Sequence, residues 1–399
     1  MAKFKDICTK IGSGTTPKGG KEAYCEDGIS LIRSQNVLDF AFSAGGLAYI
    51  NELQAEKLKN VIVEEDDVLL NITGDSVARA CIVDKKYLPA RVNQHVCIIR
   101  ADSSKAIPSY LLYYLQLNKE YLLQLASGGA TRNALTKDMI NNLELELPTI
   151  KEQQKVVAVL DDIQKKIDFN NAINENLEQQ TKALYQSWFV DYMPFEGIIP
   201  EGWHKGPLSD LADAIICGKT PSTKHSEYYG NVVPFITIPD MHNQIYAVST
   251  ERSLSTVGVA SQSGKMLPRN STCVSCIGTA GLVCMVAEPS QTNQQINSIV
   301  PSPDVSPYYI YLLAKTLSDT IQNLGSGGST ICNLNKRQFS AIEVLIPSVE
   351  SMQKFDKIVC PLFEAIHINQ VENLRLAELR DTLLPRLMSG ELDVSVIDL

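Results

Sequence analysis

The sequence predicts an α+β protein with two pseudo-repeated globular domains. Each domain is followed by a long helix, and the two helices pair as an antiparallel coiled coil. Two observations carry this prediction: the 399-residue chain repeats itself, and each copy ends in a heptad pattern. The chain is longer than a typical single domain, and 44% hydrophobic with 20% charged residues is typical of a globular protein.

Short motifs recur in the same order in both halves of the chain. GTTP at 14–17 returns as GKTP at 218–221, an offset of 204 residues, and Asn93-Gln94 returns as Asn293-Gln294. SGGATRNALTK at 127–137 returns as SGGSTICNLNK at 326–336, an offset of 199 residues. The chain therefore consists of two diverged copies of one module.

Each copy begins with short β-rich runs separated by Gly, Pro, Asn and Asp, and a helical stretch precedes its SGG segment. This pattern predicts a compact α+β globule followed by a helix. We expect a first globular domain at 1–150, a helix at 151–190, a linker at 191–204, a second globular domain at 205–349, a second helix at 350–390 and a tail at 391–399.

The helical part of each copy carries an unbroken alternation of four- and three-residue steps. A polar residue inside such an apolar seam fixes register and partner. Two unrelated surface helices would explain the heptads but not the asparagine pair that the copies share, so we expect the helices to pair with each other. The seam positions are Val156, Leu160, Ile163, Ile167, Asn170, Asn174, Leu177, Thr181, Leu184 and Trp188, then Phe355, Val359, Leu362, Ile366, Asn369, Asn373, Leu376, Arg380, Leu383 and Leu387.

The sequence contains no complete catalytic or metal-binding motif. Gly218-Lys219-Thr220 resembles the end of a phosphate-binding loop, but Asp213 stands where the first glycine is required. Cys273-x-x-Cys276 has no second pair, which favours reduced thiols over a zinc site. The acidic cluster at 64–67 has no acidic counterpart in the second copy, and the five histidines suggest no catalytic triad. We therefore expect a non-catalytic chain without a metal.

The net charge and the hydropathy of the sequence argue against further classes of protein. The net charge of −9 argues against a protein that coats DNA, although a local basic cleft can still bind phosphates. The sequence has no 18-residue apolar run, and MAKFKDICTK lacks the apolar core of a signal peptide. We therefore expect a cytoplasmic protein without a membrane partner.

The loops are rich in side chains that read DNA bases and phosphates. Asn and Gln can pair with adenine, Arg and Lys with guanine, and hydroxyls with either base. Each candidate could equally hold a turn or cap a backbone group. The candidate DNA-binding residues are Thr15, Thr16, Lys18, Arg33, Gln35, Asn36, Asn93, Gln94, Thr131, Arg132 and Asn133 in the first copy, and Lys219, Thr220, Thr237, Asp240, Asn293, Gln294, Thr330 and Lys336 in the second.

The whole layout resembles the specificity (S) subunit of type I restriction–modification enzymes, over essentially the full chain. The resemblance rests on the GTTP and GKTP turns, the SGGAT and SGGST segments, LELPTIKEQQKV before the first helix and LRDTLLPRLMSGEL at 379–392. The second copy departs from this pattern at the start of its helix. It reads Glu350-Ser351-Met352 where the first copy reads Lys151-Glu152-Gln153.

The resemblance implies two target-recognition domains, each reading one half of a split, asymmetric site in double-stranded DNA. The paired helices would act as spacer and as docking site for two modification subunits, which use S-adenosylmethionine to methylate adenine. A restriction subunit would add ATP- and Mg²⁺-dependent translocation and cleavage, and this chain would bind no cofactor itself. Two alternatives stay open: an enzyme with an unrecognised site, and a coiled-coil scaffold that does not read DNA.

Overall fold

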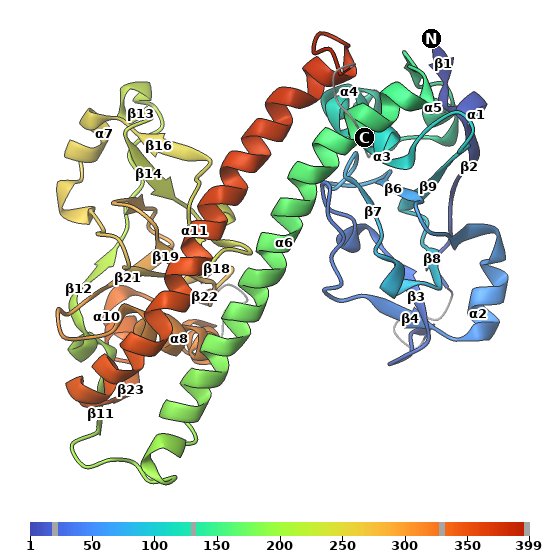
Figure 1. Ribbon diagram of the computed structural model, residues 1–399. Helices are drawn as coiled ribbons and strands as arrows, with labels where there is room; N and C mark the ends of the chain where they lie inside the picture. Colours follow the sequence, from blue (N-terminus) through green and yellow to red (C-terminus); the bar gives the residue numbers. More distant parts are fainter. Residues whose placement is uncertain (18–22, 129–132, 327–331, 395–399) are drawn as a thin grey trace. The chain divides into compact units, whose positions relative to one another are not determined.

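The computed structural model describes residues 1–17, 23–128, 133–326 and 332–394 (Figure 1). It contains two compact units, and each unit combines one globule with part of both long helices. The first unit comprises Met1–Lys165 and Leu376–Leu399, and the second comprises Lys166–Arg375. None of the helices in the described ranges is long and apolar enough to cross a membrane.

Two four-stranded sheets form the centre of the first globule. One sheet is antiparallel and has the order β2 (Cys8–Ser13), β9 (Val96–Ala101), β6 (Val68–Asn71), β7 (Ala80–Ile82). The other has the order β4 (Ala48–Ile50), β3 (Ile29–Ile32), β8 (Ala90–Val92), β5 (Ile62–Val63), with β3 and β8 parallel. A two-stranded ladder joins β1 (Ala2–Lys3) to β10 (Glu144–Leu145).

Strand β6 is buried on both faces, which explains why its sequence is an apolar run and not an alternating one. Leu69 faces a core cluster shared with the second sheet. Its neighbours Val68 and Leu70 face the other cluster, which contains the buried residues of α3 (Pro108–Leu117). The remaining helices of this globule are α1 (Phe4–Ile7), α2 (Glu52–Lys57), α4 (Lys119–Ser127) and α5 (Lys137–Asn141).

The second globule repeats the order of the central strands and has one more strand, β15 (Tyr246–Ala247), in its larger sheet. Its larger sheet has the order β12 (Ala212–Cys217), β21 (Ile296–Pro301), β17 (Thr272–Ser275), β19 (Val283–Val286), β15 (Tyr246–Ala247). The other sheet has the order β13 (Tyr229–Gly230), β16 (Arg252–Leu254), β14 (Val233–Ile236), β20 (Gln291–Thr292). Two short ladders join β11 (His204–Pro207) to β23 (Glu343–Ile346) and β18 (Ile277–Gly278) to β22 (Cys332–Asn333).

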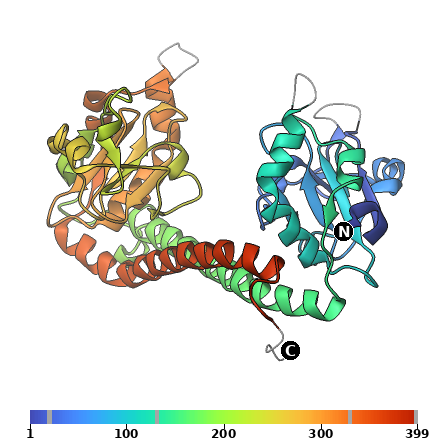
Figure 2. The same cartoon turned by 90° about the horizontal axis from the view of Figure 1, so that it is seen from above.

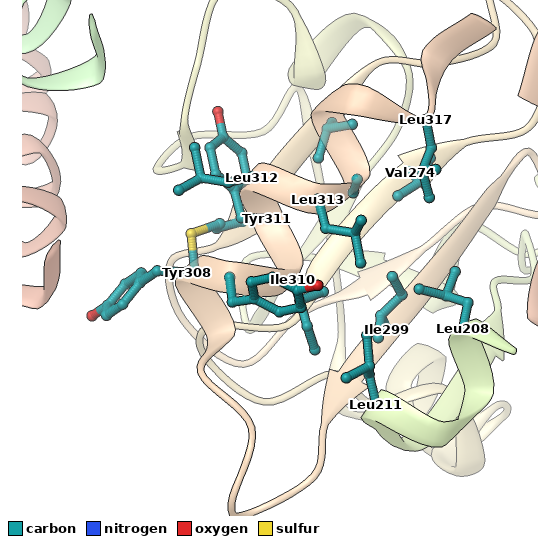
Figure 3. Packing of buried hydrophobic residues seen from close by; sticks show 14 of the residues in the cluster. Leu208, Leu211, Val274, Ile299, Tyr308, Ile310, Tyr311, Leu312, Leu313 and Leu317 are labelled. Atoms are coloured by element: carbon teal, nitrogen blue, oxygen red, sulfur yellow. The ribbon is translucent and has the colours of Figure 1, made fainter. Parts of the chain in front are cut away.

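The duplication extends to irregular backbone features. The first strand of the main sheet has a register shift between Cys8 and Lys10, and β12 has the same shift between Ala212 and Ala214. The second globule also contains α7 (Thr256–Ala260), α8 (Pro307–Thr316), α9 (Ser318–Ser326) and α10 (Lys336–Ser340). Helix α8 packs its apolar side chains against the sheet, with Leu313 near Ile299 in the same buried cluster (Figure 3).

The long helices α6 (Ile150–Phe189) and α11 (Val349–Met388) have 40 residues each. In the second unit they run antiparallel, because Asn170 pairs with Asn373 while Asn174, one turn later, pairs with Asn369, one turn earlier. They lie side by side in both views (Figures 1 and 2). In the first unit, Arg380 Nη1 donates to Gln164 Oε1 at 2.7 Å in the same antiparallel sense.

The two long helices begin with different contacts. In the first copy, Thr149 N and Oγ1 donate to Glu152 Oε2 at 2.8 and 2.7 Å, a cap that satisfies a free helix-terminal donor. In the second copy, Ser348 Oγ donates to Ser351 Oγ at 2.9 Å. Met352, which is buried, replaces a polar residue of the first copy. The sequence departure at this point therefore changes the contacts while the helix is retained.

All of the predicted seam residues are buried or half-buried. Additional helix residues outside the four–three pattern are buried as well, namely Val157, Tyr185, Phe189 and Phe363. They belong to the core clusters of the globules. Each long helix therefore buries a seam towards its partner and a second face against a globule.

The connecting segment and the end of the chain are both packed. After α6, Phe195 contacts Trp188 and Trp203 with ring centroids 5.8 and 5.2 Å apart, so the segment to the second globule is fixed by aromatic contacts. Near the C-terminus, Leu392 and Val394 pack against the core of the first globule. The end of the described chain therefore packs on the first globule.

Candidate nucleic-acid interface

In the first copy, the two recurring motifs GTTP and Asn-Gln contact each other. Gly14 N donates to Asn93 O at 3.1 Å, and Thr16 Oγ1 donates to Gln94 Oε1. A Cβ atom at Gly14 would lie 1.7 Å from Val92 O, so the close approach of the loop to the turn requires glycine. We call this arrangement, residues 14–17 with 93–95, the first Thr–Gln clamp.

The second copy builds the same arrangement from residues 218–221 and 293–295, the second Thr–Gln clamp. Thr220 Oγ1 donates to Gln294 Oε1 at 2.5 Å, and Lys219 N donates to Thr292 O at 2.9 Å. A Cβ atom at Gly218 would lie 2.1 Å from Asn293 O. Motifs that lie more than 70 residues apart thus form one local structure twice, which a pair of unrelated turns would not do.

The asparagine of each clamp holds the turn and faces inward. Asn93 Oδ1 accepts a hydrogen bond from His95 N at 2.9 Å, and Asn293 Oδ1 accepts one from Gln295 N at 3.0 Å. Asn93 and Asn293 are buried, whereas Gln94 and Gln294 are exposed. Asn93 and Asn293 therefore act as turn-forming residues, and the groups that face solvent are those around them.

Two further segments meet beside each clamp. In the first copy Thr73 bridges Ala134, and Gly74 N donates to Asn133 O at 3.2 Å. In the second copy Ile277 pairs with Asn333 and Gly278 with Cys332. Gly74 and Gly278 have nearly the same left-handed backbone, with φ of 77° and 76°. Ile72 N donates to His95 O at 2.9 Å, and Cys276 N donates to Gln295 O at 2.8 Å, so each loop is joined directly to its clamp.

The candidates around 33–36 stabilise their own loop. Asn36 is fully buried, and its Nδ2 donates to Ser43 O at 2.9 Å. Arg33 Nη2 and Gln35 Nε2 donate to Gly46 O at 2.5 and 3.1 Å. Asn36 therefore has no free group for a base edge in this structure, and its polar character reflects a buried loop contact.

Asp240 in the second copy is a structural residue for a similar reason. It is buried, and its Oδ2 accepts hydrogen bonds from Thr237 N and Oγ1 at 2.8 and 2.6 Å. Its Oδ1 accepts from Glu251 N at 2.8 Å. Both carboxylate oxygens of Asp240 are therefore used within the globule, and a base contact by Asp240 stays a prediction. Thr237 itself is half-buried in the same network.

The other candidates differ in exposure. Thr15, Thr16, Gln94, Asn133, Lys219, Gln294 and Lys336 are exposed, and Thr220 is half-buried. Lys18, Thr131, Arg132 and Thr330 lie outside the described residues. The exposed candidates, together with the clamp residues, form the candidate interface of each copy.

Lys137 belongs to the candidate interface of the first copy although it was not among the candidates. It is the first residue of α5, and Lys336 is the first residue of α10 at the same position in the second copy. Both lysines are exposed. Lys137 also lines a cleft of about 480 Å³ beside β2, together with Lys10 and Asn60. Burial, with Arg100 nearby, lowers the pKa of Lys10. The recurrence of lysine at an offset of 199 residues is the sequence signal that could have identified Lys137.

The two long helices also carry large apolar side chains that are exposed. Phe169 is 67% exposed, and Ile368, its counterpart at an offset of 199 residues, is 62% exposed. Ile173 is 47% exposed one turn after Phe169. Apolar side chains exposed at equivalent positions of both helices are candidates for a protein–protein contact. Within the described ranges, no group of three or more His, Cys, Asp and Glu residues could hold a metal ion.

Comparison with known proteins gives a consistent match along the chain. A family model described as the type I restriction modification DNA specificity domain matches residues 1–179 and 200–378. The HindI type I restriction enzyme specificity subunit of Haemophilus influenzae is 34% identical over 91% of this chain and 94% of its own length. The MjaIX specificity subunit of Methanocaldococcus jannaschii is 26% identical over 99% of this chain and 93% of its own.

A solved structure supports the fold. The S subunit of a type I restriction–modification system from M. genitalium matches with a TM-score of 0.59, over 97% of this chain and 95% of that chain, at 14% identity. The family model matches both copies of the module in turn, in agreement with the internal repeat. This chain therefore belongs to the family of type I restriction–modification specificity subunits, which are DNA-binding proteins.

Proposed function

We propose that this specificity subunit reads a bipartite site in duplex DNA, with one globule for each half-site, and that it is non-catalytic by itself. The observation that carries the proposal is the Thr–Gln clamp, which is built twice around the same threonine–glutamine hydrogen bond and surrounded by different side chains. Two copies of the same clamp, each surrounded by different side chains, suit a DNA target whose two halves differ in sequence. Exposed hydroxyl, amide and ammonium groups are the groups that read base edges and phosphates.

The long helices are proposed to bind two modification subunits. Helix α11 packs against the second globule through Phe363, which stacks on Tyr308 at 4.5 Å between ring centroids. Phe169, Ile173 and Ile368 are left exposed on the helices. Because Phe169 and Ile368 occupy equivalent positions of the repeat, they offer similar apolar contacts to two copies of one partner.

The partner subunits are also proposed to supply the chemistry. S-adenosylmethionine would belong to the modification subunits, and ATP and Mg²⁺ to a restriction subunit. The net charge of −9 gives this chain little general attraction to phosphates, so the partners would contribute many of the phosphate contacts. A steeper salt dependence of DNA binding for the complex than for the chain alone would support this, and equal dependence would contradict it.

The proposal is tested with the chain alone and with its modification subunits. The complex is expected to protect two separated stretches of DNA with a fixed gap, and to methylate adenines only in one bipartite sequence. The chain alone should neither methylate nor cut DNA with S-adenosylmethionine or Mg²⁺. Assembly with the partners but no sequence-dependent protection would instead support the scaffold alternative, and activity of the chain alone would support an enzyme.

A matched pair of variants tests the docking surface. Phe169→Lys combined with Ile368→Lys should abolish co-purification of the modification subunits, because a charge would be buried at the contact. Leu53→Lys is the control, since Leu53 is 79% exposed on α2 and should tolerate lysine without loss of partners. Full assembly of the double variant would contradict the docking surface.

A further inference from the structure

The two Thr–Gln clamps differ at two positions that their shared hydrogen bonds leave free to vary. Thr15 and Lys219 lie between the constant glycine and threonine of the loop, and both are exposed. His95 and Gln295 follow the constant glutamine, and both are half-buried. Since the frame is the same in the two copies, a difference in the bases that they bind must arise from side chains held around that frame.

The side chain after the constant glutamine is used differently in the two copies. His95 Nδ1 lies 2.5 Å from Thr73 Oγ1, and His95 Nε2 lies 3.0 Å from Gln94 Nε2, so both ring nitrogens have partners inside the globule. Gln295 Oε1 accepts from Asn293 Nδ2 at 3.1 Å. Its own Nε2 has no hydrogen-bond partner in the part of the chain that the structure describes. The second clamp therefore offers amide donors where the first clamp has an engaged ring.

The loop residues Lys219 and Thr15 also differ in the groups that they offer. Lys219 is anchored by its backbone, because Lys219 N donates to Thr292 O at 2.9 Å, while its ammonium forms no ion pair with the described residues. Thr15 offers only a hydroxyl group at the equivalent position. The second clamp thus carries an ammonium on its loop and an amide donor after its constant glutamine, and the first carries a short neutral side chain at the loop position.

We infer that Lys219 and Gln295 determine the base sequence read by the second globule, and that Thr15 occupies the corresponding reading position in the first. This inference rests on the proposed reading of one half-site by each globule. The Lys219 ammonium suits the O6 and N7 acceptors of guanine, and the Gln295 amide nitrogen suits an acceptor on a neighbouring base edge. Lys137 and Lys336 are the same residue in both copies and suit phosphates, which carry no sequence information.

The test compares target preference of wild type and Lys219→Thr in the complex with modification subunits. Threonine is the residue that the same loop carries in the first copy, so the clamp is expected to form. Binding to a series of duplexes with each base pair of the second half-site replaced, together with mapping of methylated adenines, measures the preference. We expect the preference for guanine at one position to fall by about 5- to 150-fold, with the first half-site and the gap unchanged.

Two controls separate base reading from general attraction to DNA. Lys336→Thr should weaken binding to all sequences equally and reduce the salt slope by about one. Lys205→Thr should change neither quantity, since Lys205 lies on β11 and pairs weakly with Glu343 at 3.7 Å. A uniform loss for Lys219→Thr, or an unchanged preference, would overturn the inference. Absence of any bipartite preference in the wild-type complex would overturn the proposed function instead.

Discussion

The buried ion pair of the first globule offers a sharp test of how its core is held. Asp67 is fully buried, and its Oδ1 and Oδ2 accept hydrogen bonds from Arg100 Nε and Nη2, both at 2.8 Å. Asp67 Oδ2 also accepts from Glu64 N at 2.7 Å, which closes the turn before β6. Replacing Arg100 alone would leave a carboxylate buried without its cation.

The second globule builds the same turn without the ion pair. Ser271 stands at the position of Asp67, and its Oγ donates to Pro268 O at 2.8 Å. Val300 stands at the position of Arg100 and packs against an apolar cluster. The residue that precedes Asp67 or Ser271 has the same left-handed backbone in both copies, with φ of 68° at Asp66 and 67° at Asn270. The chain therefore supplies its own uncharged replacement for the pair.

The magnitude follows from these contacts. Breaking a buried pair by removing one partner costs about 3–5 kcal/mol. The lower end, about 3 kcal/mol, applies to Arg100→Val because the arginine side chain is 22% exposed, so water reaches part of the site. The double change Asp67→Ser with Arg100→Val should recover most of this loss, because no charge is then left buried.

The assay is urea unfolding of the full chain, followed by two signals. Both tryptophans, Trp188 and Trp203, lie in the second unit, so their fluorescence reports that unit, while far-UV circular dichroism reports both. Arg100→Val should lower the urea midpoint of the first unit only. This unfolding transition is seen by circular dichroism but not by tryptophan fluorescence. Equal destabilisation by the single and double variants, or a shift of the tryptophan transition, would refute the reasoning.

Two further predictions concern the long helices. Asn170 is 1% exposed, and its Nδ2 donates to Glu372 Oε2 and Asn373 Oδ1, both at 2.8 Å, so Asn170→Ala should lower the stability of the second unit by about 2 kcal/mol, measured by tryptophan fluorescence in urea. No coupling with Asn373→Ala in a double-mutant cycle would contradict this. Hydrogen bonds from Thr149 lower the pKa of Glu152, so its contribution is present at neutral pH and is lost as the pH falls below the ordinary value of 4.5. Glu152→Gln should therefore reduce the acid sensitivity of the first unit in circular dichroism, and an unchanged acid transition would count against the cap.

The periodic and repeated features of the fold were predictable, because each leaves a regular trace in the sequence. The four–three alternation indicated the seam, and the two asparagines indicated its register. Burial of Tyr185 and Phe363 was not predicted, because these residues face a globule and follow no seam period. A heptad pattern describes contacts between helices, and it says nothing about a second face buried against another element.

The candidate interface could be predicted only in part, because residue type does not reveal whether a side chain is buried. Polar residue type does not distinguish an exposed base-contacting side chain from a buried loop contact, and the candidates Asn36 and Asp240 are both buried. The contact of Thr16 with Gln94 joins residues 78 positions apart, and only the fold brings them together. Lys137 could have been found from the recurrence of lysine at Lys336, since the repeat aligns the two positions.

The asparagine pairs have one further consequence, for symmetry. Asn373 is the counterpart of Asn174, and Asn369 is the counterpart of Asn170, so each hydrogen-bonded pair joins one position to the other position of the repeat. Helix α6 alone therefore carries both asparagine positions that this pairing requires. Two molecules of the first half would meet with the same four amides in register, and would present two identical clamps related by a dyad. The asparagine positions of the helices are thus self-complementary, whereas other seam positions differ between the copies, as Thr181 and Arg380 do.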